Sequence, residues 1–361
     1  MQEDPVKAFI ASEFKTDPTS RNYMYMVRKL AGRNTAVLFL FPFAFVFIGA
    51  IFAHYLLVLA GSAALYTGLI VLLIHSRYKL DKEYRQMSMS FRYFLFNSPI
   101  SFSFLKYFIF GILVLSSIIS LSYLPPTIFT GIIELVAFMG ITSFLLLWSP
   151  YIRNLIRHST ELDSPGINAR LSAMEREAGI HEVRARVIDG KTFGVANAFC
   201  VGVFRPKIFI TDLLLESVSE DEAVSLLAHE LAHLKYRHVL KRILPTVVVL
   251  IAATAAIIFL GMALSGFIRI RGIQAMMPIY IQVIVYAIIF SIVFPSALIR
   301  SRQENDADRF AVFHNGYVNL AIALLKARKL NLIPLAPFNG RRYSLILRLD
   351  RLKKYEMEKP H

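Results

Sequence analysis

Six apolar blocks along the 361-residue chain constrain its fold more than any other sequence feature. Each block is long enough for a helix to cross a hydrocarbon layer of roughly 30 Å. The chain is 18% charged, whereas soluble domains carry about 25% charged residues. The pattern predicts a multi-span α-helical membrane protein with six transmembrane helices. The blocks are Thr35–Ala53, Tyr55–Ile74, Tyr107–Leu124, Thr127–Trp148, Ile243–Leu264 and Met277–Ile299.

Lysine and arginine residues near the ends of the blocks predict the orientation. They cluster before the first block, between the second and third, after the fourth and after the sixth. The positive-inside rule places these connections in the cytoplasm, so both termini and residues 150–242 are expected on the cytoplasmic side of a cell membrane. The net charge of +15 reflects the same flanking residues. We therefore expect contact with the lipid bilayer and no nucleic-acid partner.

Residues 150–242 have a different character and predict an α+β unit between the fourth and fifth blocks. Gly166–Ala178 has the apolar spacing of a helix. Ser219, with Glu222 three residues later, is typical of a capping box that starts a further helix. Three short apolar or alternating runs predict strands at Val183–Ile188, Ala196–Val203 and Lys207–Leu214.

The helix predicted after Ser219 carries the segment His229-Glu230-Leu231-Ala232-His233. Residues four apart lie on the same face of a helix, so both imidazoles can bind a single metal ion. Glu230 lies beside them and can take a proton from a metal-bound water as a general base. The pattern predicts one zinc ion per chain and a hydrolytic site.

A zinc site that activates water needs a third protein ligand, and Glu304 is the candidate. It follows the sixth block directly. The chain leaves the cytoplasm through the fifth block and returns through the sixth, so Glu304 is expected on the same face as His229 and His233. Asp308, one helical turn later, can accept a hydrogen bond from the distal nitrogen of a ligand histidine.

Two other polar residues invite a functional interpretation. Glu134 is the acidic residue inside the fourth block, and a carboxylate within a membrane span is a functional candidate. His238 follows His233 by five residues and is offset from the ligand face of a continuous helix. We expect His238 to be structural or to support a ligand, with substrate contact as the alternative.

The paired motifs resemble those of the HtpX and CAAX-prenyl-protease group of membrane zinc endopeptidases. The resemblance covers roughly residues 165–352 and is carried by the segments LLAHELAH, Asn197-Ala198-Phe199 and Glu304-Asn305-Asp306-Ala307-Asp308. It implies zinc on His229, His233 and Glu304, with Glu230 as base and Asp308 supporting a ligand. It also implies an edge strand over Asn197–Val203, along which an extended substrate adds as a further strand. The implied substrates are polypeptides, chiefly misfolded membrane proteins in quality control.

The chain departs from this family near its C-terminal end. The family often has a His-Pro-Pro-containing segment there, with an arginine six residues after the histidine. Here Arg342 stands at the expected histidine position and Arg348 at the arginine position. A guanidinium can stabilise an oxyanion, so both arginines are candidates for substrate binding, together with Asn197, Ala198 and Phe199.

Two alternatives remain at this point. Four spans before the HELAH helix, and the segment Gly202–Lys207, are also similar to receptor-type zinc proteases that cleave one regulator. A non-catalytic metal-binding membrane protein is the other alternative, although a structural zinc site has no need of Glu230. The expected organisation is a cytoplasmic N-terminal segment (1–34), a four-span region (35–149), a cytoplasmic protease segment (150–242), a transmembrane hairpin (243–299) and a cytoplasmic segment with the third ligand and a basic C-terminus (300–361).

Overall fold

The statements below concern the residues that the computed structural model describes. They are 4–14, 18–32, 55–98, 100, 101, 104, 158–180, 183–201, 206–238, 240, 241, 244, 300–335 and 345–359. The predicted first, third, fourth and sixth spans lie outside the described residues, as does the fifth except for Leu244. Glu134 also lies outside them.

The second predicted span falls within α3 (Tyr55–Arg85), a helix of 31 residues. In the part of the chain that the structure describes, no helix is both long and apolar enough to cross a membrane. The six spans and the domain boundaries therefore stay predictions. The part of α3 that follows the predicted span contacts the helical residues 18–32, because the Tyr23 hydroxyl donates to the buried Asp81 at 2.5 Å and Arg77 pairs with the same carboxylate.

A four-stranded sheet supports the site, with the strand order β1-β2-β4-β3. β2 (Arg184–Ile188) and β4 (Lys207–Thr211) are parallel, and their register pairs Ala185 with Ile208. β1 (Thr160–Glu161) and β3 (Ala198–Val201) are antiparallel to their neighbours and form the two edges. The three predicted strands are present, but the last is shorter than predicted, and β1 is a strand that the pattern did not predict.

The predicted third strand ends at Thr211 instead of Leu214. The Thr211 hydroxyl accepts a hydrogen bond from the Leu214 backbone N–H, so Thr211 caps the short helix α9 (Asp212–Leu215). The apolar residues of α9 fit the strand pattern, so the sequence predicts that the strand continues to Leu214. One of them, Leu214, is buried in the same core as Ile208 and Ile210, so the apolar run serves a helix and a strand in turn.

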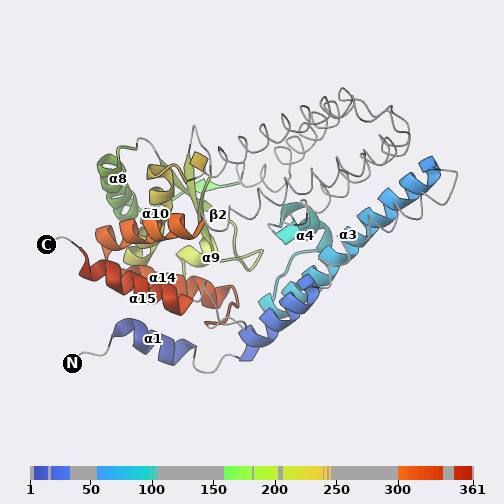
Figure 1. Cartoon of the computed structure of the whole chain (residues 1–361), viewed down its shortest axis with the longest axis horizontal. Coiled ribbons are helices and arrows are strands. Elements are labelled where there is room, and N and C mark those ends of the chain that lie inside the picture. Colours follow the sequence, from blue (N-terminus) through green and yellow to red (C-terminus); the bar gives the residue numbers. More distant parts are fainter. Residues whose placement is uncertain are drawn as a thin grey trace, which may run out of the picture.

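The helix α10 (Glu220–Lys235) lies at the centre of the described fold (Figure 1). It packs against α8 (Pro165–Ala178), against β3 and against α14 (Tyr317–Leu330). The predicted capping box is present, because the Ser219 hydroxyl accepts from the Glu222 backbone N–H and the Glu222 carboxylate accepts from the Ser219 backbone N–H. Leu227 and Leu231 are fully buried, so this helix is the core element of the domain.

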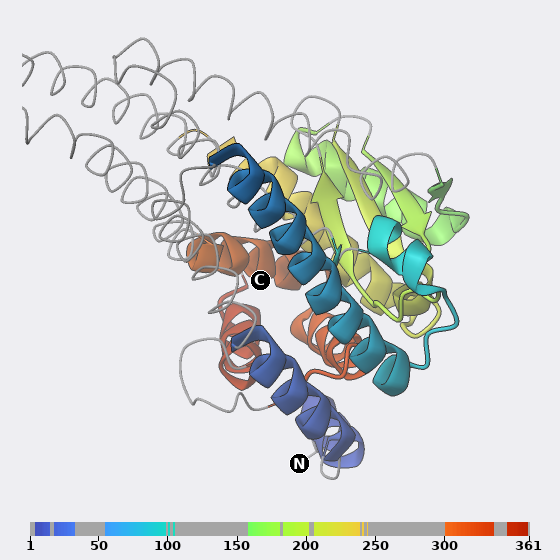
Figure 2. The ribbon, with the colours of Figure 1, turned by 90° about the vertical axis from the view of Figure 1, so that its right-hand side faces the viewer.

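The helices at the two ends of the chain cover α14. α15 (Leu345–Met357) and α1 (Pro5–Glu13) both pack on it, as Figure 1 shows. Figure 2 shows α3 passing beside the sheet, with α4 (Phe91–Asn97) near the strands. Arg85 of α3 donates to the carbonyl oxygens of Gly194 and Asn331, so α3 contacts the loop that leads into β3.

Candidate metal centre

His229 and His233 lie on one face of α10, as their spacing predicts. Both are buried, with 6% and 8% of their surface exposed. Their Nε2 atoms are 3.3 Å apart and point to the same side of the helix. Two imidazole nitrogens this close, inside a fold, favour a shared ligand ion.

Glu304 completes the cluster from a second helix. Residues 300–315 are helical, and this segment places the Glu304 carboxylate 3.5 Å from His229 Nε2 and 3.9 Å from His233 Nε2. One ligand atom from each of the three residues lies within 4.8 Å of the others. Two imidazoles and one carboxylate are the ligand set of a catalytic zinc site with a position left for water, so the residues fit the predicted metal.

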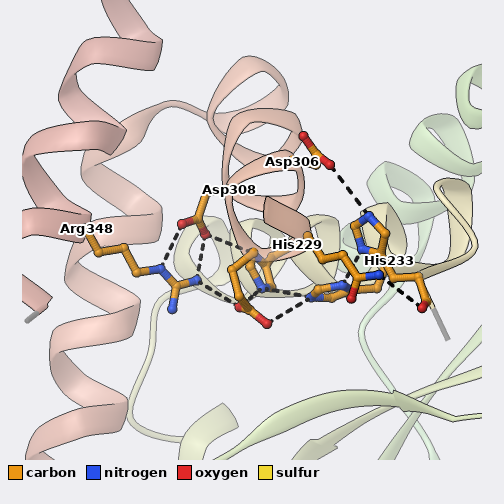
Figure 3. A network of polar contacts seen from close by, with 8 residues as sticks. His229, His233, Asp306, Asp308 and Arg348 are labelled. Atoms are coloured by element: carbon orange, nitrogen blue, oxygen red, sulfur yellow. Dashed lines mark hydrogen bonds and ion pairs between the residues drawn. The ribbon is translucent and has the colours of Figure 1, made fainter. Parts of the chain in front are cut away.

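Asp308 contacts His229, the first histidine of the HELAH segment. Its Oδ1 atom lies 3.0 Å from His229 Nδ1, and only 1% of the residue is exposed. Arg348 of α15 binds the same carboxylate through Nε at 2.8 Å and Nη2 at 2.6 Å (Figure 3). The Asp308–His229 contact leaves His229 Nε2 to face the metal position, and the resulting tautomer is the one that a zinc ligand needs.

The charges around His229 are set by two carboxylates and by Arg348. Burial raises the pKa of Asp308, but Arg348 and His229 outweigh burial and hold it at about 2. Burial also raises the pKa of Glu304, and the hydrogen bond and charge of His229 lower it to about 2. Burial lowers the pKa of His229, whereas its contacts with Asp308 and Glu304 raise it to about 9. Two ionised carboxylates therefore face this imidazole.

Glu230 lies between the histidines and the edge strand. Its carboxylate accepts hydrogen bonds from the backbone N–H and the thiol of Cys200 in β3. Burial raises the pKa of Glu230 to about 7, against the opposing effect of His229. A carboxylate with such a pKa can both accept and release a proton near neutral pH.

The predicted substrate-binding residues fall at different places. Ala198 and Phe199 belong to β3, and the Phe199 ring stacks on Phe209 of the neighbouring strand. Asn197 precedes β3, and its backbone N–H donates to the Thr211 hydroxyl. Arg348 lies beside the metal cluster, and Arg342 is outside the described residues.

Three residues of the site were missed or underrated by the sequence analysis. Cys200 contacts the base, and the alternation of β3, which puts residues 198 and 200 on one face, is the signal that points to it. His238 Nδ1 lies 2.7 Å from His233 Nδ1, and His238 Nε2 lies 3.8 Å from Asp306. No sequence signal singled out Asp306, because acidic residues are common at exposed helix starts.

A capped HELAH helix, a carboxylate from a later helix and an adjacent edge strand are the arrangement expected of a metallopeptidase of the HExxH class. Comparison with known proteins agrees with this class. Residues 161–324 match the model of Peptidase family M48. A protein described as "Protease HtpX homolog" from Aeropyrum pernix is 30% identical over 117 residues, which is 30% of this chain and 35% of that protein. The chain thus spans about a third of this curated relative.

A solved structure is similar over nearly the whole chain. The crystal structure of S. mikatae Ste24p aligns with a TM-score of 0.50 at 19% identity, over 98% of this chain and 92% of that one. This likeness concerns the fold. The family match covers residues 161–324, somewhat less than half of the chain, and this segment is similar to peptidase family M48.

Proposed function

We propose that this protein is an integral membrane zinc endopeptidase that cleaves polypeptides at the cytoplasmic face of the cell membrane. The observation that carries the proposal is the convergence of His229, His233 and Glu304 on one point beside Glu230. Ligands from two helices, with His233 and Glu304 71 positions apart in the sequence, meet at the base that hydrolysis requires. A structural metal site has no use for such a carboxylate.

In this mechanism Glu230 handles the proton. His229, His233 and Glu304 would hold zinc, and the metal would supply Lewis-acid chemistry at the scissile carbonyl and lower the pKa of a water molecule. A Glu230 carboxylate oxygen accepts the proton from the attacking water and then delivers it to the departing amine. The Cys200 backbone N–H holds Glu230 in place for both transfers.

The edge strand β3 is the proposed binding surface for the substrate backbone. β3 pairs with β4 on one side, and the sheet order leaves its other side at the edge of the described sheet. An extended peptide can add there through main-chain hydrogen bonds, with Asn197, Ala198 and Phe199 beside it. Because Cys200 of the same strand contacts Glu230, a peptide on β3 lies next to the base.

The two arginines receive separate roles in this proposal. Arg348 uses Nε and Nη2 to bind Asp308, which supports a role in holding that carboxylate. Arg342 stays the candidate for contact with a developing oxyanion. The proposed substrates are misfolded membrane proteins in a quality-control role, which the resemblance to the HtpX group implies, and the similarity to a protein described as a protease supports polypeptide substrates.

Cleavage of an unfolded protein tests the activity. The full chain is purified in detergent, loaded with zinc and incubated with casein beside the Glu230→Gln variant. The matched control is Glu220→Gln, the same substitution at an exposed position of the same helix. The proposal predicts zinc-dependent cleavage by the wild type and the control, and a loss of at least about 1,000-fold in Glu230→Gln with zinc still bound. Equal activity of both variants would contradict it.

A further inference from the structure

His233 uses its two ring nitrogens for different purposes. Nε2 faces Glu304 at 3.9 Å and His229 Nε2 at 3.3 Å, on the metal side. Nδ1 points the other way and lies 2.7 Å from Nδ1 of the buried His238. A contact of this length between two ring nitrogens is a hydrogen bond, so one of the two atoms carries a proton and the other accepts it.

Proton accounting decides which nitrogen donates. A histidine that binds a metal through Nε2 has its proton on Nδ1. His233 is therefore the donor, and His238 Nδ1 is the acceptor. A neutral His238 that accepts at Nδ1 carries its own proton on Nε2, and that atom lies 3.8 Å from the Asp306 carboxylate, beyond hydrogen-bond distance but close enough for the negative charge to favour a proton there. His233 therefore donates to His238, and the proton on His238 Nε2 faces Asp306, whose side chain is 60% exposed.

The chain brings His238 to this place by ending the helix. α10 ends at Lys235, and Arg237 has a left-handed backbone with φ of 50°. The turn moves His238 out of the helical register in which it would be offset from His233. The Gln303 side-chain amide donates a hydrogen bond to the His238 carbonyl oxygen at 3.2 Å and holds this position. The Tyr236 ring stacks on the His238 ring, with their centroids 5.6 Å apart.

His238 thus contacts both helices of the site: α10 through His233, and the helical segment 300–315 through Gln303. Gln303 and Asp306 belong to the same helical segment as the third ligand, Glu304, so one helix supplies a ligand, a backbone tether and a partner for the supporting histidine. Figure 3 shows Asp306 and Asp308 on this helix, with their dashed contacts leading toward opposite ends of the ligand pair.

We infer that His238 and Asp306 form a positioning relay for the second zinc ligand, His233, as the counterpart of Asp308 and Arg348 for His229. The inference rests on the proposed metal site. His238 fixes the ring orientation and tautomer of His233 through the hydrogen bond between their Nδ1 atoms, and the charge of Asp306 favours the matching tautomer of His238. Neither residue touches the substrate in this role.

Zinc affinity of the full chain in detergent tests the relay without reference to proteolysis. The dissociation constant for Zn²⁺ is measured by competition with a chromophoric chelator. His238→Ala removes the acceptor and is expected to weaken zinc binding on the order of 10–100-fold. His238→Asn restores an acceptor oxygen near the Nδ1 position and is expected to recover most of the affinity. Asp306→Asn is expected to give a smaller loss than His238→Ala.

The matched control is His314→Asn, a half-buried histidine on the same helical segment that pairs with Glu177 outside the site. It should bind zinc as tightly as the wild type. The thermal midpoint of each zinc-free variant checks the fold, and a His238→Ala variant that fails to fold leaves His238→Asn and His238→Gln to decide. Gln lacks the acceptor at the Nδ1 position, so the relay predicts weaker zinc binding by Gln than by Asn.

Failure of the relay and failure of the metal site give different results. If His229→Ala loses zinc while His238→Ala, His238→Gln and the control bind it as the wild type does, the relay is wrong and the metal site stands. If His229→Ala also retains full affinity, the metal site itself is wrong. Equal affinities of His238→Gln and His238→Asn, both below the wild type, would assign His238 a packing role and overturn the relay.

Discussion

Arg348 binds Asp308 through two guanidinium nitrogens, at 2.8 and 2.6 Å, and so joins the C-terminal helix α15 to the metal centre. The Asp308 side chain is 1% exposed, and its other contact is His229. A helix distant in the sequence therefore contacts the carboxylate that orients His229, a proposed zinc ligand. Because the carboxylate is buried, its ionised form depends on this arginine.

Removal of this arginine should destabilise the protein. Arg348→Ala leaves the Asp308 carboxylate buried with its main cationic partner missing, and we expect a loss of about 3 kcal/mol in stability, read as a lower thermal midpoint. Zinc binding should weaken in parallel. Lys354→Ala on the same helix removes an exposed cation and should change stability by less than about 0.5 kcal/mol. A midpoint of Arg348→Ala equal to that of Lys354→Ala would refute this role.

The N-terminal helix should detach from the domain in acid. Asp4 caps α1 and accepts from Lys353 at 2.8 Å and from the Tyr317 hydroxyl at 3.1 Å. The hydrogen bond from Lys353 is the main cause that holds the pKa of Asp4 below its ordinary value of 3.8. A depressed carboxyl pKa contributes stability above the unfolded value, and this stability is lost as the pH falls through the folded pKa.

Hydrogen exchange across residues 5–13 measures this attachment. We expect protection of α1 at neutral pH and its loss below the ordinary Asp pKa, while Asp4→Asn should already show reduced protection at pH 7 because it cannot pair with Lys353. The same protection in wild type and Asp4→Asn at pH 7 would show that Val6, buried on this helix, holds α1 without the charge.

Gly190 should be required for the shape of the loop before β3. A Cβ atom there would collide with the Val195 carbonyl oxygen and with the Thr211 side chain. Gly190→Ala is therefore expected to lower the free energy of unfolding by about 1–3 kcal/mol. It should raise KM for casein more than it changes zinc affinity, because it displaces β3, the proposed binding strand for the substrate. Gly32→Ala, where a Cβ meets nothing within 4 Å, should be neutral or slightly stabilising. Unchanged stability and KM in Gly190→Ala would contradict this account.

The capping box of α10 should contribute a modest stability. Ser219→Ala removes the acceptor for the Glu222 N–H, and the expected cost is about 1 kcal/mol. Ser219→Asp retains an acceptor and should keep most of that stability. Thermal unfolding of the two variants beside the wild type measures the difference. Equal midpoints for Ser219→Ala and Ser219→Asp would mean that the Glu222–Lys326 ion pair, at 2.7 Å, alone anchors this end of the helix.

The elements with strong local signals were predictable. α10 begins directly after Ser219 because the capping box is a local pattern, and α8 ends at Ala178 before Gly179, whose φ of 68° suits glycine. The end of β4 was not predictable from periodicity, since the apolar residues after Thr211 fit a buried strand as well as a helix. β1, with two residues, is too short for any pattern.

The grouping of His229, His233 and Glu304 could be predicted, and the contacts around it only in part. The structure places Glu304 beside both histidines, whereas the membrane crossings from which its position was predicted stay a prediction. His238 was underrated because a continuous helix carries it away from His233. The turn at Arg237 brings His238 back beside His233, and no residue pattern predicts a left-handed backbone conformation at an arginine. The contact between Cys200 and Glu230 depends on how the sheet packs against α10, which spacing does not reveal.

The zinc content of the purified protein tests whether His229, His233 and Glu304 bind a zinc ion. The full chain is purified, freed of metal, reloaded with zinc and analysed by elemental analysis beside Glu230→Gln and Glu304→Gln. The account predicts one zinc ion per chain in the wild type and in Glu230→Gln, and a large loss in Glu304→Gln, where a neutral amide replaces the carboxylate ligand. The absence of stoichiometric zinc in the wild type, or full retention in Glu304→Gln, would contradict it.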